Sequence, residues 1–216
     1  MKLLFTTLSL FLVLLFSNGL AQELLQKNSA FISGLVGAAS ISSSGNEGNN
    51  PVSFAFGGSF GIPLTKNLFL YTRSSYTSKS NFQSYYNTSY LTGNFQLSDE
   101  FTEVNSSFSQ LLFNSGLLYH IPLSEEFALG VNGGLTFMVV NQDARLKNGT
   151  VVSSIDNENI WGAFGGLIVE KGWKDSDVTT FVEAQYNYAR SDALYRTKAL
   201  NAMNYSFGVS YYLTGK

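Results

Sequence analysis

Large apolar residues alternate with small or polar residues along most of the chain after residue 22. The stretch 127–140 is the clearest case: its odd positions include Phe127, Leu135 and Phe137, and its even positions are mostly small or polar. Successive side chains of a β-strand point to opposite faces, so this period of two predicts strands rather than helices. Eight segments share the pattern: 30–41, 52–62, 68–78, 105–121, 127–140, 159–171, 177–190 and 201–213.

The connections between these segments alternate in length. Four are long and rich in Ser, Asn, Gly and charge, namely 42–51, 79–104, 141–158 and 191–200, and the three that separate them, 63–67, 122–126 and 172–176, are short. Alternating long and short connections are typical of an up-and-down antiparallel barrel that has long loops at one end and short turns at the other. We therefore predict a single barrel over residues 30–213.

Charge indicates which face of the strands points outward. Only 13% of the residues are charged, against about 25% in an average soluble domain. A soluble barrel with an apolar interior would also alternate, but its outer face would carry many Lys and Glu side chains, and the small, polar faces of these strands carry very few. The pattern thus favours an all-β, eight-stranded, antiparallel up-and-down transmembrane β-barrel, with the large apolar face in lipid and a small, polar interior. Aromatic residues near the strand ends are candidates for interfacial belts: Tyr76, Tyr119, Phe127, Trp161, Tyr186, Tyr188, Tyr205 and Tyr211.

The first 21 residues read as a targeting segment. Lys2 precedes an apolar run over 3–16, and Gly19 and Ala21 supply small residues at the −3 and −1 positions of a cleavage site. This pattern predicts a secretory signal peptide cut before Gln22; the alternative is an uncleaved membrane anchor, for which the run is short. The predicted organisation is a signal peptide over 1–21, a periplasmic N-terminal segment over 22–29, the barrel over 30–213 and a C-terminal tail over 214–216.

The chain resembles the small eight-stranded bacterial outer-membrane barrels of the OmpA-barrel and OmpX type. The resemblance covers 30–213 and rests on strand layout and on a C-terminal signal of the form polar-x-Gly-x-x-aromatic-x-hydrophobic. Ser206, Gly208, Tyr211 and Leu213 occupy these places, although the family usually ends on Phe. The resemblance implies a cell outer membrane location with both termini in the periplasm. The partners it implies are outer-membrane lipid and the barrel-assembly machinery.

Two charged residues lie well inside predicted strands, each on the face opposite the large apolar side chains. Arg73 is in the third segment and Glu183 in the seventh. A charge facing lipid near the midplane costs ~2–4 kcal/mol for Arg, so we predict that both face the lumen and pair there. The same interior is predicted to hold five amide side chains: Gln110, Asn114, Asn132, Gln185 and Asn187. This network either only fills the barrel or contributes to transport, and an eight-stranded interior is just wide enough for side chains to fill.

No constellation of residues indicates catalysis. His120 is the sole histidine. Eight-stranded barrels that modify lipid A place a His and a Ser near the outer rim, whereas His120 directly precedes Ile121-Pro122 and faces inward at the rim with the short connections. There is no Cys, no metal-binding motif and no phosphate-binding loop. We expect no enzyme activity, no cofactor and no bound metal. The net charge of −2 also argues against nucleic-acid binding.

The long connection 79–104 mixes Tyr with Ser and Asn. Phe82, Tyr85, Tyr86 and Tyr90 are its candidate contact residues, since such mixtures make adaptable binding surfaces; the alternative is a solvated loop whose aromatic residues fold over the barrel mouth. We expect a monomer with a structural or surface-interaction role, in which the extracellular loops 79–104 and 141–158 contact an extracellular ligand or matrix. The alternative function is a narrow channel or a binding pocket for a small solute.

Overall fold

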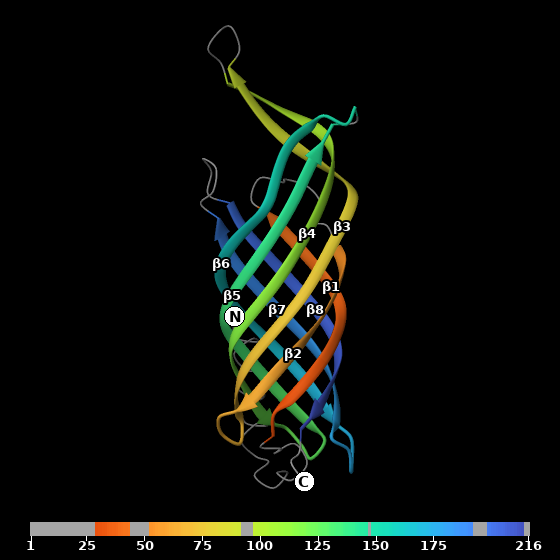
Figure 1. Cartoon of the computed structure of the whole chain (residues 1–216), viewed down its shortest axis with the longest axis vertical. Coiled ribbons are helices and arrows are strands. Elements are labelled where there is room, and N and C mark those ends of the chain that lie inside the picture. The colour runs from red at the N-terminus through yellow and green to blue at the C-terminus, as the bar shows by residue number, and fades with distance from the viewer. Residues whose placement is uncertain (1–28, 44–51, 92–96, 147, 192–197, 214–216) are drawn as a thin grey trace, which may run out of the picture.

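The computed structural model describes residues 29–43, 52–91, 97–146, 148–191 and 198–213. They form a closed barrel in which each strand pairs antiparallel with its neighbours in the chain, and the last strand pairs with the first (Figure 1). The strands are β1 (Phe31–Ser43), β2 (Val52–Pro63), β3 (Leu68–Leu91), β4 (Leu97–Pro122), β5 (Phe127–Arg145), β6 (Val151–Gly172), β7 (Val178–Ser191) and β8 (Lys198–Tyr212). The predicted fold class is confirmed.

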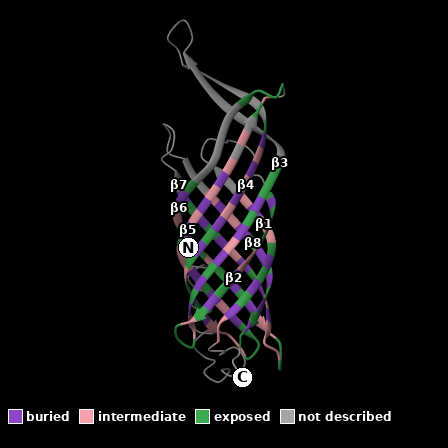
Figure 2. Ribbon diagram, in the orientation of Figure 1, coloured by how far each residue is buried: buried purple, intermediate pink, exposed green. Residues whose placement is uncertain are grey.

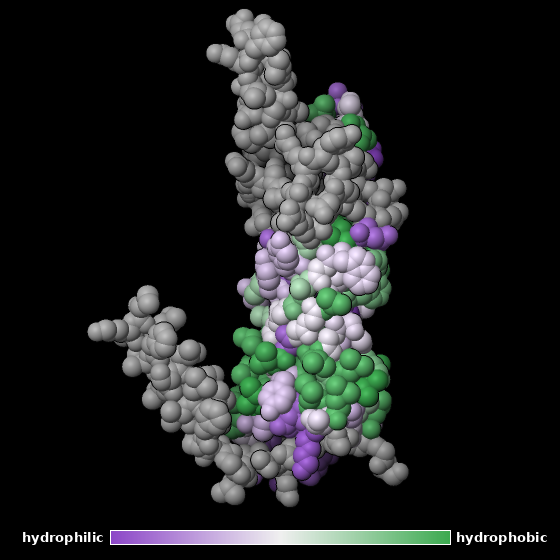
Figure 3. All heavy atoms as spheres, turned by 90° about the vertical axis from the view of Figure 1, so that its left-hand side faces the viewer, coloured by the Kyte–Doolittle hydropathy of each residue, from purple (hydrophilic) through white to green (hydrophobic). Residues whose placement is uncertain are grey.

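Burial alternates along the part of each strand whose side chains are described, as Figure 2 shows by its purple and green stripes. The large apolar side chains point outward: Leu135 is 63% exposed and Trp161 is 67% exposed. Apolar residues gather on the outer wall of the lower barrel in Figure 3. All eight candidate belt residues are exposed as well. The outer wall is therefore suited to hydrocarbon, and the closed ladder leaves no strand edge inside the membrane.

The predicted loop over 79–104 is wrong in large part. β3 continues to Leu91 and β4 begins at Leu97, so most of this segment extends the barrel strands as a hairpin. The register shifts between Lys79 and Phe82, just beyond Thr77, the last β3 residue that pairs with β2. Such a bulge bends a strand at a barrel rim. The sequence did not reveal the strand because apolar and polar residues do not alternate regularly along this segment.

The predicted loop over 141–158 is wrong for the same reason. β5 extends to Arg145 and β6 begins at Val151. The turn between them contains Gly149 with a φ of 87°, a left-handed conformation that glycine adopts without steric cost. The strands β3 to β6 therefore rise well above the others in Figure 1. We call this end of the barrel the hairpin end, and the opposite end, with the connections 64–67, 123–126 and 173–177, the short-turn end.

The interior is less uniformly polar than the sequence indicated. Two clusters of buried apolar side chains lie inside the barrel. The first consists of Phe31, Leu35, Phe69, Tyr71, Leu118, Phe164, Ile168, Phe181 and Tyr212. The second consists of Phe108, Leu112, Met138, Val140, Ile160, Ala189 and Ala202. These layers fill space that the predicted small, polar face would have left open.

Residues 1–28 and 214–216, which include the predicted signal peptide and C-terminal tail, lie outside the described residues. The described part of the chain contains no helix long and apolar enough to cross a membrane.

Candidate functional site

Arg73 and Glu183 form an ion pair across the lumen. Arg73 is on β3 and Glu183 is on β7, which are four strands apart in an eight-stranded ring and hence on opposite walls. The Arg73 guanidinium donates through Nη1 to Glu183 Oε2, and the two side chains are 0% and 1% exposed. The pair therefore spans the interior at this level.

Glu183 is the centre of a wider set of hydrogen bonds. Asn132 Nδ2 donates to Glu183 Oε1 at 2.9 Å. The Tyr71 hydroxyl and Gln185 Nε2 each donate to the same oxygen at 3.4 Å. The second arm of the guanidinium, Arg73 Nη2, donates to Ser206 Oγ at 3.0 Å. A buried carboxylate needs such partners because it has lost its hydration.

Two more of the predicted amides extend this network along the interior. Asn114 Nδ2 donates to Gln185 Oε1 at 2.7 Å and to Asn187 Oδ1 at 3.0 Å. Gln110 is not brought into the network. Its Nε2 donates to the Met138 sulfur at 3.1 Å, beside the second apolar cluster. Of the predicted lumenal residues, the structure thus places six in one network and Gln110 outside it.

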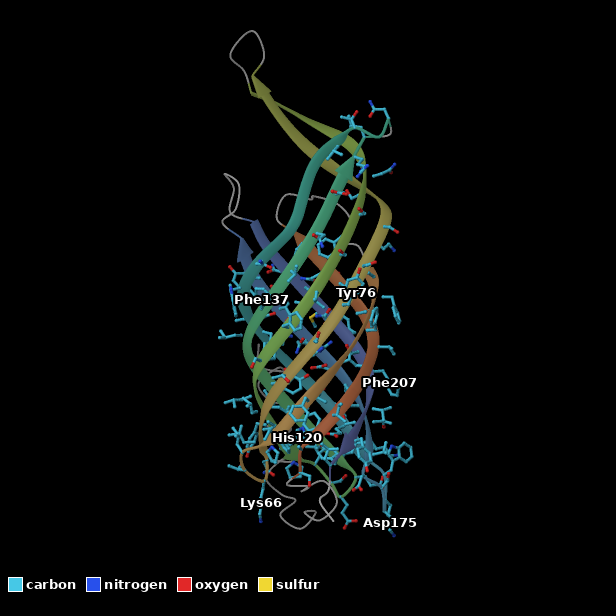
Figure 4. All side chains as sticks on the ribbon, in the orientation of Figure 1. Lys66, Tyr76, His120, Phe137, Asp175 and Phe207 are labelled. Carbon is cyan, nitrogen blue, oxygen red and sulfur yellow. The ribbon has the colours of Figure 1, made fainter. Side chains whose placement is uncertain are left out.

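A second buried polar cluster, which sequence reasoning missed, lies toward the short-turn end. Glu170 on β6 accepts hydrogen bonds from the hydroxyls of Thr179 and Tyr212, the latter at 3.0 Å. His120 Nε2 is 3.5 Å from Glu170 Oε2, and Figure 4 places His120 near this end, above Lys66. The sequence did contain a sign of this cluster, because Glu170 alternates in step with Phe164 and Ile168 and therefore points to the same face of the strand. The glycines of this segment made it hard to tell the inward face from the outward one.

The cavity within this second cluster is small. It measures about 10 Å³ and lies between residues that include Tyr71, His120 and Glu170. A cavity of this size holds about one water. Among the described residues, no group of three or more His, Cys, Asp or Glu side chains is arranged to hold a metal ion.

Comparison with known proteins gives structural neighbours only. No family model matches the chain, and no curated protein matches it. The outer membrane protein OprG from Pseudomonas aeruginosa superposes with a TM-score of 0.51 at 15% identity, over 88% of this chain and 98% of that one. Neisserial surface protein A superposes with a TM-score of 0.48 at 12% identity, over 85% of this chain and 97% of that one.

The attachment invasion locus protein Ail of Yersinia pestis gives a TM-score of 0.45 at 10% identity, over 85% of this chain and 97% of that one. The chain has the fold of the small outer-membrane β-barrels. Together with its apolar outer wall, this fold assigns the protein to the bacterial outer membrane.

In this outer-membrane barrel, the residues of the predicted assembly signal have different surroundings. Ser206 is buried and accepts the hydrogen bond from Arg73. Gly208 faces inward, where an added Cβ would overlap the Phe181 ring and approach the backbone of Gly34. Tyr211 and Leu213 are exposed on the outer side. Ser206 and Gly208 therefore have packing roles in the folded barrel, and reading by the assembly machinery stays a prediction.

The predicted contact residues Phe82, Tyr85, Tyr86 and Tyr90 are in the extended part of β3. Their backbones pair with β4, but their side chains lie outside the described residues. In β4 and β5 the uppermost pair is Asn105 with Arg145, so the four strands β3 to β6 continue as one sheet above the closed barrel.

Proposed function

We propose that this outer-membrane barrel is a surface-interaction protein that binds an extracellular ligand or matrix component through the sheet formed by the extended β3–β4 and β5–β6 hairpins. The observation that carries the proposal is strand length. β3 has 24 residues and β4 has 26, whereas about 9–11 residues are enough to cross the hydrocarbon layer at a typical tilt. The excess length supports a role outside the membrane.

The pairing of the strands supports the same proposal. In the described part of the chain, β2 pairs with β3 only as far as Thr77, and β7 pairs with β6 only from Gly162 toward the short-turn end. Above those points each outer strand of the sheet has one described neighbour. A strand edge of this kind can accept an extended segment of a partner through main-chain hydrogen bonds.

The closed interior weighs against the alternative of a channel. The Arg73–Glu183 pair crosses the lumen, and apolar side chains fill further layers. We also expect no catalysis, because His120 contacts Glu170 near the short-turn end, remote from the hairpins. The barrel then serves as a monomeric membrane anchor that contacts lipid and is inserted by the barrel-assembly machinery.

The test removes each hairpin while preserving the barrel register. Lys79 pairs with Phe108 and Val140 pairs with Glu158. Replacing 80–107 or 141–157 by Asn-Gly therefore joins facing residues through a two-residue turn. The variants and the intact protein are displayed on cells and tested on immobilised matrix proteins and polysaccharides.

We expect the intact protein to bind at least one surface, and the 80–107 variant to lose that binding while its barrel still shows heat-modifiable migration in gel electrophoresis. Removal of 141–157 should weaken binding by less, because this hairpin is shorter. Undiminished binding by a folded chain that lacks both hairpins would refute the proposal.

A further inference from the structure

The lipid-facing wall of the barrel contains a groove. Its volume is about 760 Å³, and it extends over the outer surfaces of β1 to β6, from Ile32 to Trp161. This volume is within the roughly 300–1,000 Å³ that is typical of small-molecule sites. Most of its lining side chains point outward, and the lining also includes four buried residues of the same strands, Ser33, Ser59, Arg73 and Asn114.

The strand register explains the shape of this groove. One row of facing residues runs Gly58, Ser74, Phe113, Phe137 and Trp161 across successive strands. The side chains of this row are small on β2 and β3 and aromatic on β4, β5 and β6. The adjacent row brings Thr72 opposite Ser115, so small residues form a floor beside an aromatic wall.

The aromatic wall is a ladder of rings. The ring centroids of Phe113 and Phe137 are 6.4 Å apart, and those of Phe137 and Trp161 are 4.9 Å apart. Aromatic pairs at these separations stabilise one another, and Figure 4 shows Phe137 midway along the barrel. On the opposite side of the floor, Phe60 and Ile32 point outward from β2 and β1. The groove therefore has two apolar walls.

The surroundings of the groove determine what can fill it. None of the outward-facing side chains that line it is charged, and the groove is continuous with the apolar wall that contacts hydrocarbon. Lipid tails are as apolar as the wall, so association there depends on van der Waals packing and on small residues that permit close approach. An empty groove would forfeit the dispersion contacts of its lining.

We propose that this groove is a binding site for one acyl chain of a membrane lipid. The chain lies over the floor of Gly58, Thr72, Ser74 and Ser115, between the aromatic ladder and the wall formed by Phe60 and Ile32. The site differs from the rest of the wall in its concavity, so it retains a chain that elsewhere would exchange freely with the bilayer. It involves no residue of the hairpins and is independent of the surface-interaction proposal.

The test uses a phospholipid with a photoactivatable diazirine in the middle of one acyl chain, incorporated in vesicles with the full-length protein. After irradiation, adducts are mapped by mass spectrometry. We expect adducts to concentrate on the groove, with Trp161 and Phe137 labelled severalfold more than Val182 and Val209, which are exposed on β7 and β8.

Two variants fill the floor, Ser115→Leu and Ser74→Leu, and each should reduce the labelling of Trp161 severalfold relative to Val182 in the same molecule. The matched control is Thr180→Leu, an outward position on β7 that does not line the groove, and it should leave the ratio unchanged. Uniform labelling around the wall would overturn the proposal, as would floor variants that leave the ratio unchanged. If a bifunctional cross-linker joined two copies of the protein at the groove, the groove would be assigned to a second copy of the chain instead.

Discussion

At the scale of single residues, the buried charges impose the strictest requirements. Glu183 accepts hydrogen bonds from Arg73, Asn132, Tyr71 and Gln185. Removing the cation leaves a carboxylate that no remaining partner neutralises, because amides and hydroxyls supply dipoles but no charge. The pair is therefore more costly to break than to replace as a whole.

Arg73→Met should destabilise the barrel by about 3–5 kcal/mol, the typical cost of leaving a buried charge unpaired. The double variant Arg73→Met with Glu183→Leu should recover most of this loss, because no charge is then left. Urea unfolding in detergent micelles measures both. Ser206→Ala is the control and should cost about 1.5–3 kcal/mol, since it removes one hydrogen bond from the charged Arg73 guanidinium and leaves Glu183 paired. Equal losses in the single and double variants would contradict this account.

Gly61 tests packing inside the barrel. A Cβ at this position would overlap the buried ring of Phe31 on the neighbouring strand. We expect Gly61→Ala to lower the free energy of unfolding by about 1–3 kcal/mol, as overpacking does. In a Phe31→Leu background the same substitution should cost much less. If the cost is the same in both backgrounds, Phe31 is not its cause.

Glu170 tests the cluster that the sequence did not reveal. Glu170→Leu removes the acceptor of the Thr179 and Tyr212 hydroxyls. We expect a loss of about 1–3 kcal/mol, the usual cost when a buried polar group loses its hydrogen-bond acceptor, measured by unfolding in micelles. Glu170→Gln keeps an acceptor and should cost less. A variant with Leu that is as stable as one with Gln would mean that the hydroxyls find other partners.

At the scale of elements, the connections show how local geometry shapes the barrel. The short turns hold β2–β3, β4–β5 and β6–β7 in register, and Asp175 in the last of them has a φ of 58°. Asp and Asn tolerate this left-handed conformation, whereas β-branched residues do not. At the other end, bulges begin where the closed barrel stops, and the strands continue as hairpins.

Asp175→Val should destabilise the barrel by about 1–2 kcal/mol, the usual cost of the left-handed conformation for an ordinary residue. Asp175→Asn should be nearly neutral and Asp175→Gly neutral or slightly stabilising. Unfolding midpoints of the three variants provide the measurement. The order Val, then Asn, then Gly is expected from least to most stable. A Val variant as stable as Gly would show that the turn relaxes.

At the scale of the whole molecule, the outer-membrane barrel separates into three regions. The first is the closed barrel in the membrane, with its apolar outer wall. The second is the short-turn end, and the third is the four-stranded sheet that extends from the barrel at the hairpin end. The interior pairs strands from opposite walls and leaves little free volume near Glu170. This arrangement supports the proposed anchoring role over the channel alternative.

The intact protein should give no steady channel events when it is folded and reconstituted in planar bilayers, because Arg73 and Glu183 close the lumen. Heat-modifiable migration of the same preparation establishes that the protein is folded. Reproducible single-channel steps from folded protein would instead favour the narrow-channel alternative. Retention of steps after removal of both hairpins would assign them to the barrel itself.

The sequence by itself determined the strand positions within the membrane and the face that meets lipid. Leu135 and Trp161 are exposed because alternation and scarce charge leave one consistent orientation of a closed sheet. The same alternation predicted that Arg73 and Glu183 point inward. Alternation along a strand does not, however, indicate which strands lie opposite each other in the barrel.

The tertiary structure alone decided the rest. Ring closure brings Arg73 to Glu183 across 110 positions of the chain, and register alone aligns the small residues and the aromatic ladder into a groove. The hairpins above the membrane were also beyond sequence reasoning. Apolar and polar residues do not alternate regularly along these segments, and only the pairing between strands identifies them as hairpins.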